Sequence, residues 1–245
     1  MKRIIISPPT HPALVVGYTV LGAIVAFLAG GALSGAVIEW LGPSGLPVAL
    51  LVSWLLILSP PLSFVNIVVW RIRRGRELVV TVDVGYVDAF GIPIPVPRLR
   101  VVENYTLIAV NVGGALVPLT VAAVLLALVY HGVGLEALRD AGIVTAATAL
   151  ATYMGSRTVP MVGIVVPAFL PPVTSALATW LVYGLGPGAM AIAYFGGVVG
   201  SLLGADVLRL ARDIGRLKTP MASIGGAGVF DGVFLSGVIA AILAG

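Results

Sequence analysis

The chain has 245 residues, of which 59% are hydrophobic and only 10% are charged, with a formal net charge of +4. A soluble domain carries about 25% charged residues, because its surface must face water. The composition therefore excludes an ordinary soluble domain, a disordered chain and a nucleic-acid-binding protein, and it predicts a polytopic membrane protein.

Long apolar runs divide the chain into predicted membrane spans. A helix that crosses a bilayer needs about 20 apolar residues, and most of the runs reach that length. The fourth run is short, so a re-entrant segment is an alternative to a span there. We predict an all-α fold and a single membrane domain over residues 1–245, with about seven transmembrane helices. The spans lie at about 13–38, 46–70, 105–130, 141–154, 161–183, 188–208 and 221–244.

The positions of the basic residues give an orientation. With seven spans and a cytoplasmic N-terminus, all 14 basic residues except Arg139 fall in cytoplasmic segments. An excess of Lys and Arg marks the cytoplasmic side of membrane proteins. We therefore predict a protein of the cytoplasmic membrane, with its N-terminus inside and its C-terminus outside.

Residues 71–104 form the longest polar segment and are predicted to be a cytoplasmic insertion. Leu78–Val84 is rich in β-branched residues, as strands are. Gly91–Pro97 alternates proline with aliphatic residues, which excludes a helix or a central strand. The segment is predicted to be a small β-hairpin or flap at the membrane surface, either a connector or a gate for substrate.

Several predicted spans contain helix breakers, notably Ser59-Pro60-Pro61, Asn111–Pro118, Pro167–Pro172 and Gly225–Gly228. A broken membrane helix frees backbone groups, which are tolerated where protein or a watery cavity covers them. Four broken spans indicate a polar interior.

Two aspartates are the strongest candidates for chemistry, because charged groups inside a membrane are costly and are usually functional. Asp206 lies near the cytoplasmic end of the sixth predicted span, and Asp231 lies within the seventh. A short basic loop joins the two spans, so both carboxylates are expected at similar depth on neighbouring helices. The simpler alternatives are an ion pair between Asp206 and Arg209 and a helix-capping role for Asp231.

Two facing carboxylates in a medium of low dielectric share one proton. Such a pair fits two roles. In a hydrolase, one carboxylate activates water while the other protonates the carbonyl oxygen of the substrate. In a carrier, the pair binds a cation or relays a proton. The sequence has no cysteine and no His/Glu spacing typical of zinc sites, so no metal and no cofactor is predicted.

Much of the chain from the third span onward resembles an uncharacterised prokaryotic membrane family, the domain of unknown function sixteen-fourteen. The resemblance rests on the segments Gly204–Leu208 and Ser223–Leu235, supported by Asn111–Pro118 and Pro167–Pro172. It implies an integral membrane protein and no particular activity.

The last two spans are loosely similar to presenilin-type and prepilin-type aspartyl proteases. Those enzymes carry one aspartate at a helix end and a second in a Gly-x-Gly-Asp motif near the cytosolic face. Here Gly226-Ala227-Gly228 precedes Asp231 with two residues inserted. The segment most similar to their Pro-Ala-Leu motif is Pro167-Ala168-Phe169, which here lies upstream of both aspartates. The resemblance implies an aspartyl dyad beside a glycine-rich break.

Three functions are consistent with these features. The first is an intramembrane aspartyl protease that cleaves transmembrane-helix substrates near the cytoplasmic face, with residues 78–84 pairing with the unwound substrate. The second is a secondary transporter that uses its broken helices, Asn111 and Asp231. The third is a non-catalytic membrane scaffold. We assign Asp206 and Asp231 as catalytic residues, and Gly226, Gly228, Pro167 and Asn111 as substrate-binding residues. Membrane lipid is the expected partner; no nucleic acid is expected, and no oligomeric state is assigned.

Overall fold

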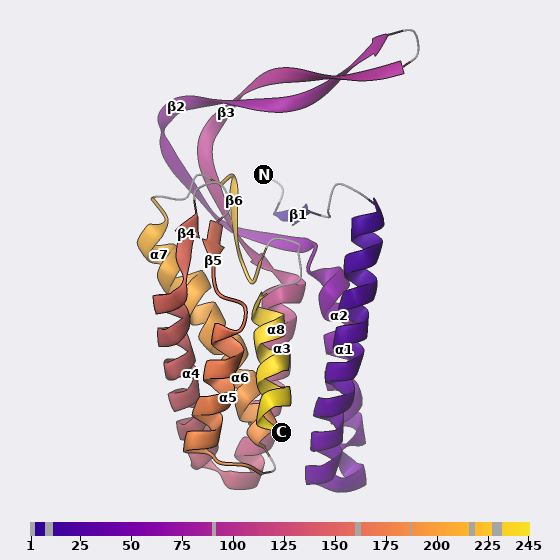
Figure 1. Cartoon of the computed structure of the whole chain (residues 1–245), viewed down its shortest axis with the longest axis vertical. Coiled ribbons are helices and arrows are strands. Elements are labelled where there is room, and N and C mark those ends of the chain that lie inside the picture. The colour runs from indigo at the N-terminus through magenta and orange to yellow at the C-terminus, as the bar shows by residue number, and fades with distance from the viewer. Residues whose placement is uncertain are drawn as a thin grey trace.

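The computed structural model describes residues 3–7, 12–89, 92–159, 163–186, 188–215, 219–226 and 232–245, with the backbone alone for 12–14, 73–89 and 92–104. Within these ranges, a bundle of near-parallel helices carries short strands at one end, and a long two-stranded ribbon projects from that end (Figure 1). The chain begins at the ribbon end, whereas the C-terminus lies toward the other end (Figure 1).

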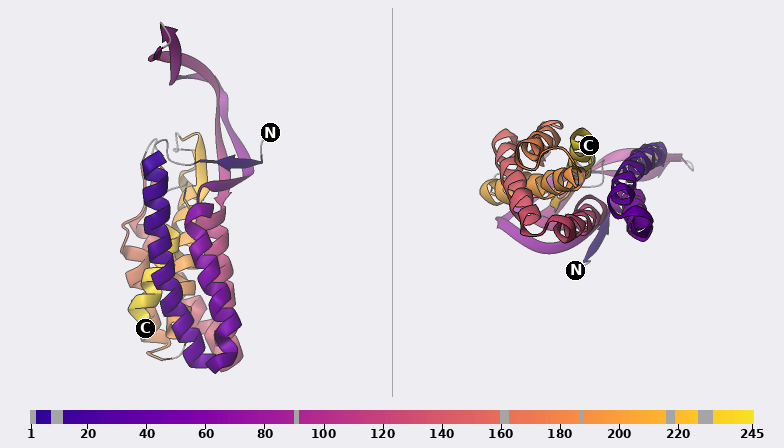
Figure 2. Two further views of the ribbon diagram at one scale, coloured as in Figure 1. Left: turned by 90° about the vertical axis from the view of Figure 1, so that its right-hand side faces the viewer. Right: turned by 90° about the horizontal axis from the view of Figure 1, so that it is seen from below.

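The bundle begins with an antiparallel pair, α1 (Pro12–Leu41) and α2 (Leu46–Leu62), joined by the 3-10 turn Gly42–Gly45. Seen from below, this pair stands beside the remaining helices (Figure 2). The hydroxyls of Ser34 and Ser53 lie 2.7 Å apart between the two helices. The later helices are, in chain order, η2 (Val112–Leu116, a π-helix), α3 (Val117–Val133), α4 (Leu135–Gly155), α5 (Leu170–Val182), α6 (Ala189–Ser201), η3 (Leu202–Arg209, a π-helix), α7 (Leu210–Asp213) and α8 (Gly232–Ala244).

Within the described residues, three helical segments are long and apolar enough to cross a membrane, and they mark the chain as a membrane protein: Val15–Leu62, Val112–Val133 and Ala189–Asp213. Two shorter helices, α5 and α8, are apolar but have only 13 residues each. At 1.5 Å per residue each is about 20 Å long, less than the ~30 Å of a bilayer core. Each lies at the end of a longer predicted span. Because both helices are too short to cross the bilayer core, the prediction of seven complete helical spans is not confirmed.

The prediction of an all-α fold is wrong in one respect, since a sheet accompanies the helices. Its order is β1-β2-β3-β6, and β4 and β5 form a separate pair. The ribbon is the antiparallel pair β2 and β3; β1 extends it on one side, and β6 pairs in parallel with Leu107–Val110 on the other. The strands are β1 (Ile4–Ile6), β2 (Val65–Ala89), β3 (Ile92–Asn111), β4 (Arg157–Val159), β5 (Gly163–Val165) and β6 (Met221–Ile224).

The predicted hairpin at 71–104 is present but longer, because its strands extend into two predicted spans. Residues 65–70 and 105–111 are strand and not helix. Pro60 and Pro61 lack the N–H groups that continue a helix, and α2 ends at Leu62. The chain that follows is rich in β-branched residues, and a short apolar run of that kind is equally compatible with a buried strand. Hydropathy alone therefore misplaced these two boundaries.

The prolines of the ribbon fit its ladder. Pro93, Pro95 and Pro97 pair with Asp88, Tyr86 and Val84 on β2. β6 pairs only with residues 107–110 of β3, so among the described residues the proline-containing part of β3 has β2 as its one neighbour in the sheet. Proline is tolerated at such an outer edge, because the missing N–H would point away from the ladder.

The helix α6 is the centre of the bundle and approaches its neighbours through glycine. A methyl group at Gly200 would lie 2.6 Å from Cβ of Thr148 on α4. A methyl group at Gly197 would lie 2.7 Å from the carbonyl oxygen of Ser236 on α8. Small residues allow membrane helices to pack this closely. The close approach holds η3, the continuation of α6, against α4 and beside β6.

Candidate functional site

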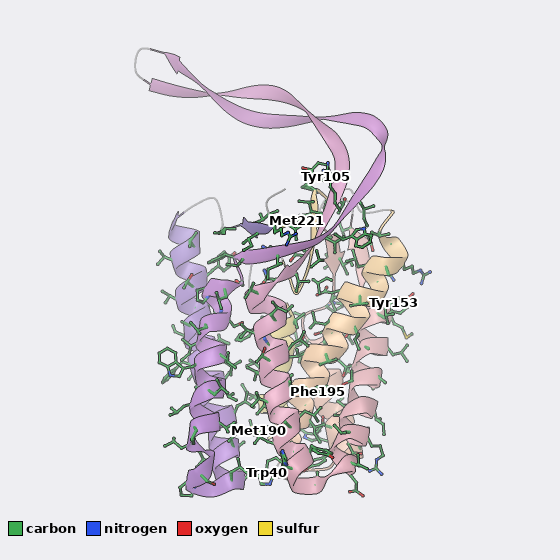
Figure 3. The ribbon with its side chains drawn as sticks, turned by 180° about the vertical axis from the view of Figure 1, so that it is seen from behind. Trp40, Tyr105, Tyr153, Met190, Phe195 and Met221 are labelled. Carbon is green, nitrogen blue, oxygen red and sulfur yellow. The ribbon has the colours of Figure 1, made fainter. Side chains whose placement is uncertain are left out.

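A cavity of about 610 Å³ lies at the ribbon end of the bundle, beside Asp206. Its lining comes from the end of α4, the end of α6 with η3 and the start of α7, the segment from β5 into α5, the strand β6 with the residues on either side of it, and the start of α8. In Figure 3, Met221 of β6 marks this end, while Phe195, Met190 and Trp40 lie progressively nearer the other end. The lining residues that carry the argument are Thr152, Pro167, Asp206, Thr219, Ser223 and Gly226.

Asp206 is held on a π-helix, a conformation that often occurs at functional sites. The hydroxyl of Ser201, at the start of this segment, donates to the carbonyl oxygens of Gly197 and Val198, at 2.6 and 3.1 Å. These bonds support the change from α- to π-helical winding. The Asp206 side chain is half-buried, and Oδ2 accepts the backbone N–H of Gly225 at 2.7 Å. A carboxylate that lines a cavity is thus fixed by the turn that follows β6.

Gly225 adopts the left-handed conformation that this turn needs, with φ of +82°. A methyl group there would lie 2.6 Å from Cβ of Ala115 and 2.7 Å from its backbone nitrogen. Glycine is therefore required both for the backbone angle and for the contact with η2.

Two buried hydroxyls that line the cavity have no hydrogen-bond partner in the described part of the chain. They belong to Thr152, which is 0% exposed, and Thr219, which is 8% exposed. A buried hydroxyl without a partner costs about 1–3 kcal/mol, so such groups are uncommon in a packed bundle. Both residues line the cavity beside Asp206, although their hydroxyl oxygens are themselves buried.

A buried network of asparagines ties the ribbon to the cavity wall. Asn111 Nδ2 donates to the carbonyl oxygen of Ser63 at 2.5 Å and to Oδ1 of Asn66 at 3.1 Å. Asn111 Oδ1 accepts the N–H of Gly114 at 2.7 Å, which caps η2. Oδ1 of Asn66 also accepts the hydroxyl of Ser223, at 2.6 Å, and Ser223 lines the cavity. Asn111 is thus connected to the cavity through Asn66 and Ser223, and it does not line the cavity itself.

Replacing Asn111 with aspartate is expected to lower the free energy of unfolding by about 2–4 kcal/mol. The carboxylate has the shape of the amide but brings an acceptor where the oxygens of Ser63 and Asn66 need a donor. Thermal unfolding in detergent would measure the loss. As a control, Ser223→Ala leaves Asn66 bonded to Asn111 and should cost about 1 kcal/mol or less. Equal unfolding midpoints for wild type and Asn111→Asp would contradict this role.

Three of the six assigned site residues, Asp206, Pro167 and Gly226, meet at the cavity. Asp231 and Gly228 lie outside the described residues, although Gly226 and Gly232, on either side of that stretch, both line the cavity. The predicted alternative of an Asp206–Arg209 ion pair is wrong, because Nε of Arg209 lies 2.9 Å from Oδ2 of Asp213. Among the described residues, no group of three or more His, Asp or Glu is placed to hold a metal ion.

Sequence reasoning missed the hydroxyls of Thr152 and Thr219, and it missed β6. Residues 221–224 were included in the seventh span because they are apolar. The available signal was the four-residue run Met221–Ile224 between a polar loop and a glycine-rich turn, which also fits a short strand. Isolated threonines carried no signal, since their significance depends on which helices pack together.

Comparison with known proteins gives a family and no activity. The family model described as "Protein of unknown function (DUF1614)" matches residues 61–243. This match confirms the resemblance inferred from the sequence, and it leaves α1 and nearly all of α2 outside the matched region. No curated protein and no solved structure matches the chain.

Proposed function

The chain belongs to this family of unknown function, and we propose that it is an intramembrane aspartyl protease with Asp206 and Asp231 as its catalytic pair. The observation that carries the proposal is the position of Asp206: a half-buried carboxylate on a membrane-length helical segment, facing a cavity large enough for a ligand. Asp231 is expected to supply the second carboxyl, because Gly226 and Gly232, on either side of residues 227–231, line the same cavity.

The proposed reaction is hydrolysis of a peptide bond. The ionised carboxylate takes a proton from water as the water oxygen bonds to the carbonyl carbon. The protonated carboxyl gives its proton to the carbonyl oxygen. When the tetrahedral intermediate collapses, the C–N bond breaks, the protonated carboxyl gives its proton to the leaving nitrogen, and the other carboxylate takes back the proton from the former carbonyl oxygen. The reaction needs neither a metal nor a cofactor, in keeping with the residues proposed for it.

The edges of two strands favour an extended polypeptide as the ligand. β5 is an edge strand of the separate two-stranded sheet, and β6 is an edge strand of the larger sheet. Gly163–Val165 and Met221–Ser223 both line the cavity. An extended peptide that adds to such an edge gains backbone hydrogen bonds, and the hydroxyls of Thr152 and Thr219 provide further polar contacts.

The positions of the strands favour a different substrate-binding strand from the one predicted from the sequence. Residues 78–84 pair with residues 97–103 inside the ribbon, away from the helices (Figure 1). β5 and β6, next to Asp206, are better placed for strand addition. We therefore transfer that role from residues 78–84 to β5 and β6.

The orientation in the membrane is part of the proposal. Arg71, Arg157, Arg209 and Arg212 belong to elements at the ribbon end of the bundle (Figure 1). Basic residues favour the cytoplasmic side, so this end and the cavity are assigned to the cytoplasmic face of the cytoplasmic membrane. The C-terminus is then on the outer side, with α5 and α8 completing a bundle of seven helical passes.

A secondary transporter is the second candidate, and one observation favours it. α5 and α8 are short helices that begin beside the cavity, as discontinuous helices do in transporters. In that case Asp206 and Asp231 would bind a coupled cation. A non-catalytic scaffold would use neither carboxylate.

The test is cleavage of a model single-span protein by the purified chain reconstituted in lipid. Wild type is expected to cut within the span near its cytoplasmic end, and both Asp206→Asn and Asp231→Asn are expected to abolish the cut. If either variant still cleaves at the wild-type rate, the proposed catalytic pair is excluded. Absence of cleavage across several substrates, together with stabilisation of the protein by a particular cation, would favour the transporter.

A further inference from the structure

Two arginines converge on one tyrosine at the ribbon end of the bundle. Arg212 of α7 donates from Nη1 to the hydroxyl of Tyr153, on α4, at 2.7 Å. The guanidinium carbons of Arg209 and Arg212 each lie 6.0 Å from the centre of the Tyr153 ring. A guanidinium at this distance from an aromatic ring is weakly attracted to it, so the ring helps to hold two like charges in one place. Figure 3 shows Tyr153 on the flank of the bundle, toward the ribbon end.

The charges of the two arginines are not balanced equally. The Arg209 side chain is 21% exposed, and its Nε lies 2.9 Å from Oδ2 of Asp213. Arg212 is exposed, and among the described residues it forms no ion pair with a carboxylate. Its side-chain hydrogen bond is to the neutral hydroxyl of Tyr153. Asp213 therefore balances one of the two charges, and a positive charge remains at the surface.

A third arginine belongs to the same neighbourhood. Arg157 is exposed at the start of β4. The next residue, Thr158, donates its hydroxyl to Oδ2 of Asp213 at 2.6 Å, so β4 is fixed beside α7. Around the Asp213 carboxylate there is thus an excess of positive charge, which attracts anions.

Exposed apolar side chains lie on the bundle side of the arginines. Leu150 precedes Tyr153 by nearly one helical turn on α4 and is 60% exposed. Leu208 of η3 precedes Arg212 by about one turn and is 51% exposed. Residues at this spacing share a helix face. The two helices are in close contact here, because a methyl group at Gly204 of η3 would lie 3.0 Å from the backbone nitrogen of Tyr153.

We propose that Tyr153, Arg209 and Arg212 form a headgroup site for an anionic phospholipid, whose acyl chains lie along Leu150 and Leu208. Guanidinium groups bind phosphate oxygens through paired N–H donors. Basic clusters between membrane helices are a usual setting for the recognition of anionic headgroups. Lipid surrounds every membrane protein, whereas this place selects for negative charge. The site needs no reaction at Asp206, so it is independent of the proposed protease.

Fluorescence quenching by brominated lipid measures which lipid occupies this place. The chain has no cysteine, so Leu150→Cys can carry a single bimane label beside the proposed acyl chains. The full chain is reconstituted in vesicles of dioleoylphosphatidylcholine that contain either brominated phosphatidylglycerol or brominated phosphatidylcholine. The two brominated lipids differ only in the headgroup, so the ratio of their quenching constants reports selection by charge. A second reporter, Val16→Cys, lies toward the ribbon end of α1 and is 62% exposed (Figure 1).

At Leu150→Cys, phosphatidylglycerol is expected to be favoured over phosphatidylcholine by about fivefold, the usual effect of one arginine near an anionic lipid. At Val16→Cys the ratio should be close to one. Arg212→Gln should lower the preference at Leu150→Cys by about fivefold. Tyr153→Phe should lower it by about twofold or more, because the hydroxyl no longer holds Arg212 although the number of charges is unchanged.

Arg3→Gln is the matched control, because it removes the same charge at the ribbon end from a segment that pairs with β2, where the N–H of Val68 donates to Arg3 O. It should leave the preference unchanged, and thermal unfolding in detergent checks that each variant is folded. Equal losses in Arg3→Gln and Arg212→Gln, or a full preference in Tyr153→Phe, would overturn the site in favour of general surface charge. Loss of the preference on adding inorganic phosphate would identify a soluble anion as the occupant and overturn the assignment to lipid. Cleavage is not measured, so a failed protease assay leaves this result unaffected.

Discussion

Substitution of Asp206 by asparagine is expected to lower the rate of substrate cleavage by at least about 100-fold, the usual contribution of one acid–base group. The amide has the shape of the carboxylate, and its oxygen can still accept the N–H of Gly225. It can neither remove a proton from water nor return one to the leaving group. The initial rate of cleavage of a single-span substrate in lipid measures the effect, while the fold should be retained.

The matched control is Asp140→Asn, the same change at a buried aspartate in the part of α4 remote from the cavity. Asp140 is 4% exposed and forms an ion pair with Arg139 at 2.9 Å. Its replacement should leave the cleavage rate close to that of wild type, even if stability falls. Asp231→Asn should reduce the rate as much as Asp206→Asn, and the double variant should be no slower, because members of a catalytic pair act as a unit. Cleavage at the wild-type rate by Asp206→Asn would remove this residue from the mechanism.

Substitution of Gly225 by alanine is expected to destabilise the protein by about 2–4 kcal/mol. Two effects combine: alanine is strained at a φ of +82°, and its methyl group would lie 2.6 Å from Cβ of Ala115 and 2.8 Å from the carbonyl carbon of Gly114. Since two of the atoms within 3 Å of this methyl belong to the backbone, the turn must move away from η2. The N–H of Gly225 would then leave Asp206, so cleavage should fall together with stability.

Thermal or denaturant unfolding in detergent measures the loss of stability for Gly225→Ala. Gly142→Ala is the control, because a methyl group at that position on α4 has open space and the backbone is helical. Alanine favours a helix over glycine by about 1 kcal/mol, so this variant should be as stable as wild type or slightly more stable. Unchanged stability in Gly225→Ala would show that the turn adapts more easily than its contacts indicate.

The errors of the sequence-based prediction have a common physical origin. Residues 65–70 and 105–111 are apolar enough to extend a membrane helix, yet they are strands. Apolar character reports removal from water and does not distinguish a short buried strand from the end of a helix. The same ambiguity placed β6 in the seventh span, although Gly225 and Gly226, directly after it, indicated a turn.

The sequence by itself determined that the chain is a membrane protein and where most of its helices lie, and it singled out Asp206 as a candidate. These depend on local properties: the length of apolar runs, the clustering of arginines, and the cost of a charge within an apolar segment. The family match over residues 61–243 is consistent with that reading.

Only the tertiary structure decided how the cavity is built. Thr106 bonds to the carbonyl oxygen of Thr219, 113 positions away, and β3 pairs with β6 in parallel. Asn66 bonds to Ser223 across 157 positions, and Thr158 to Asp213 across 55. Such pairings have no periodicity along the chain, because they arise from the packing of α6 between α4 and α8 and from the return of the chain to the base of the ribbon. The cavity and the residues that line it follow from that long-range packing.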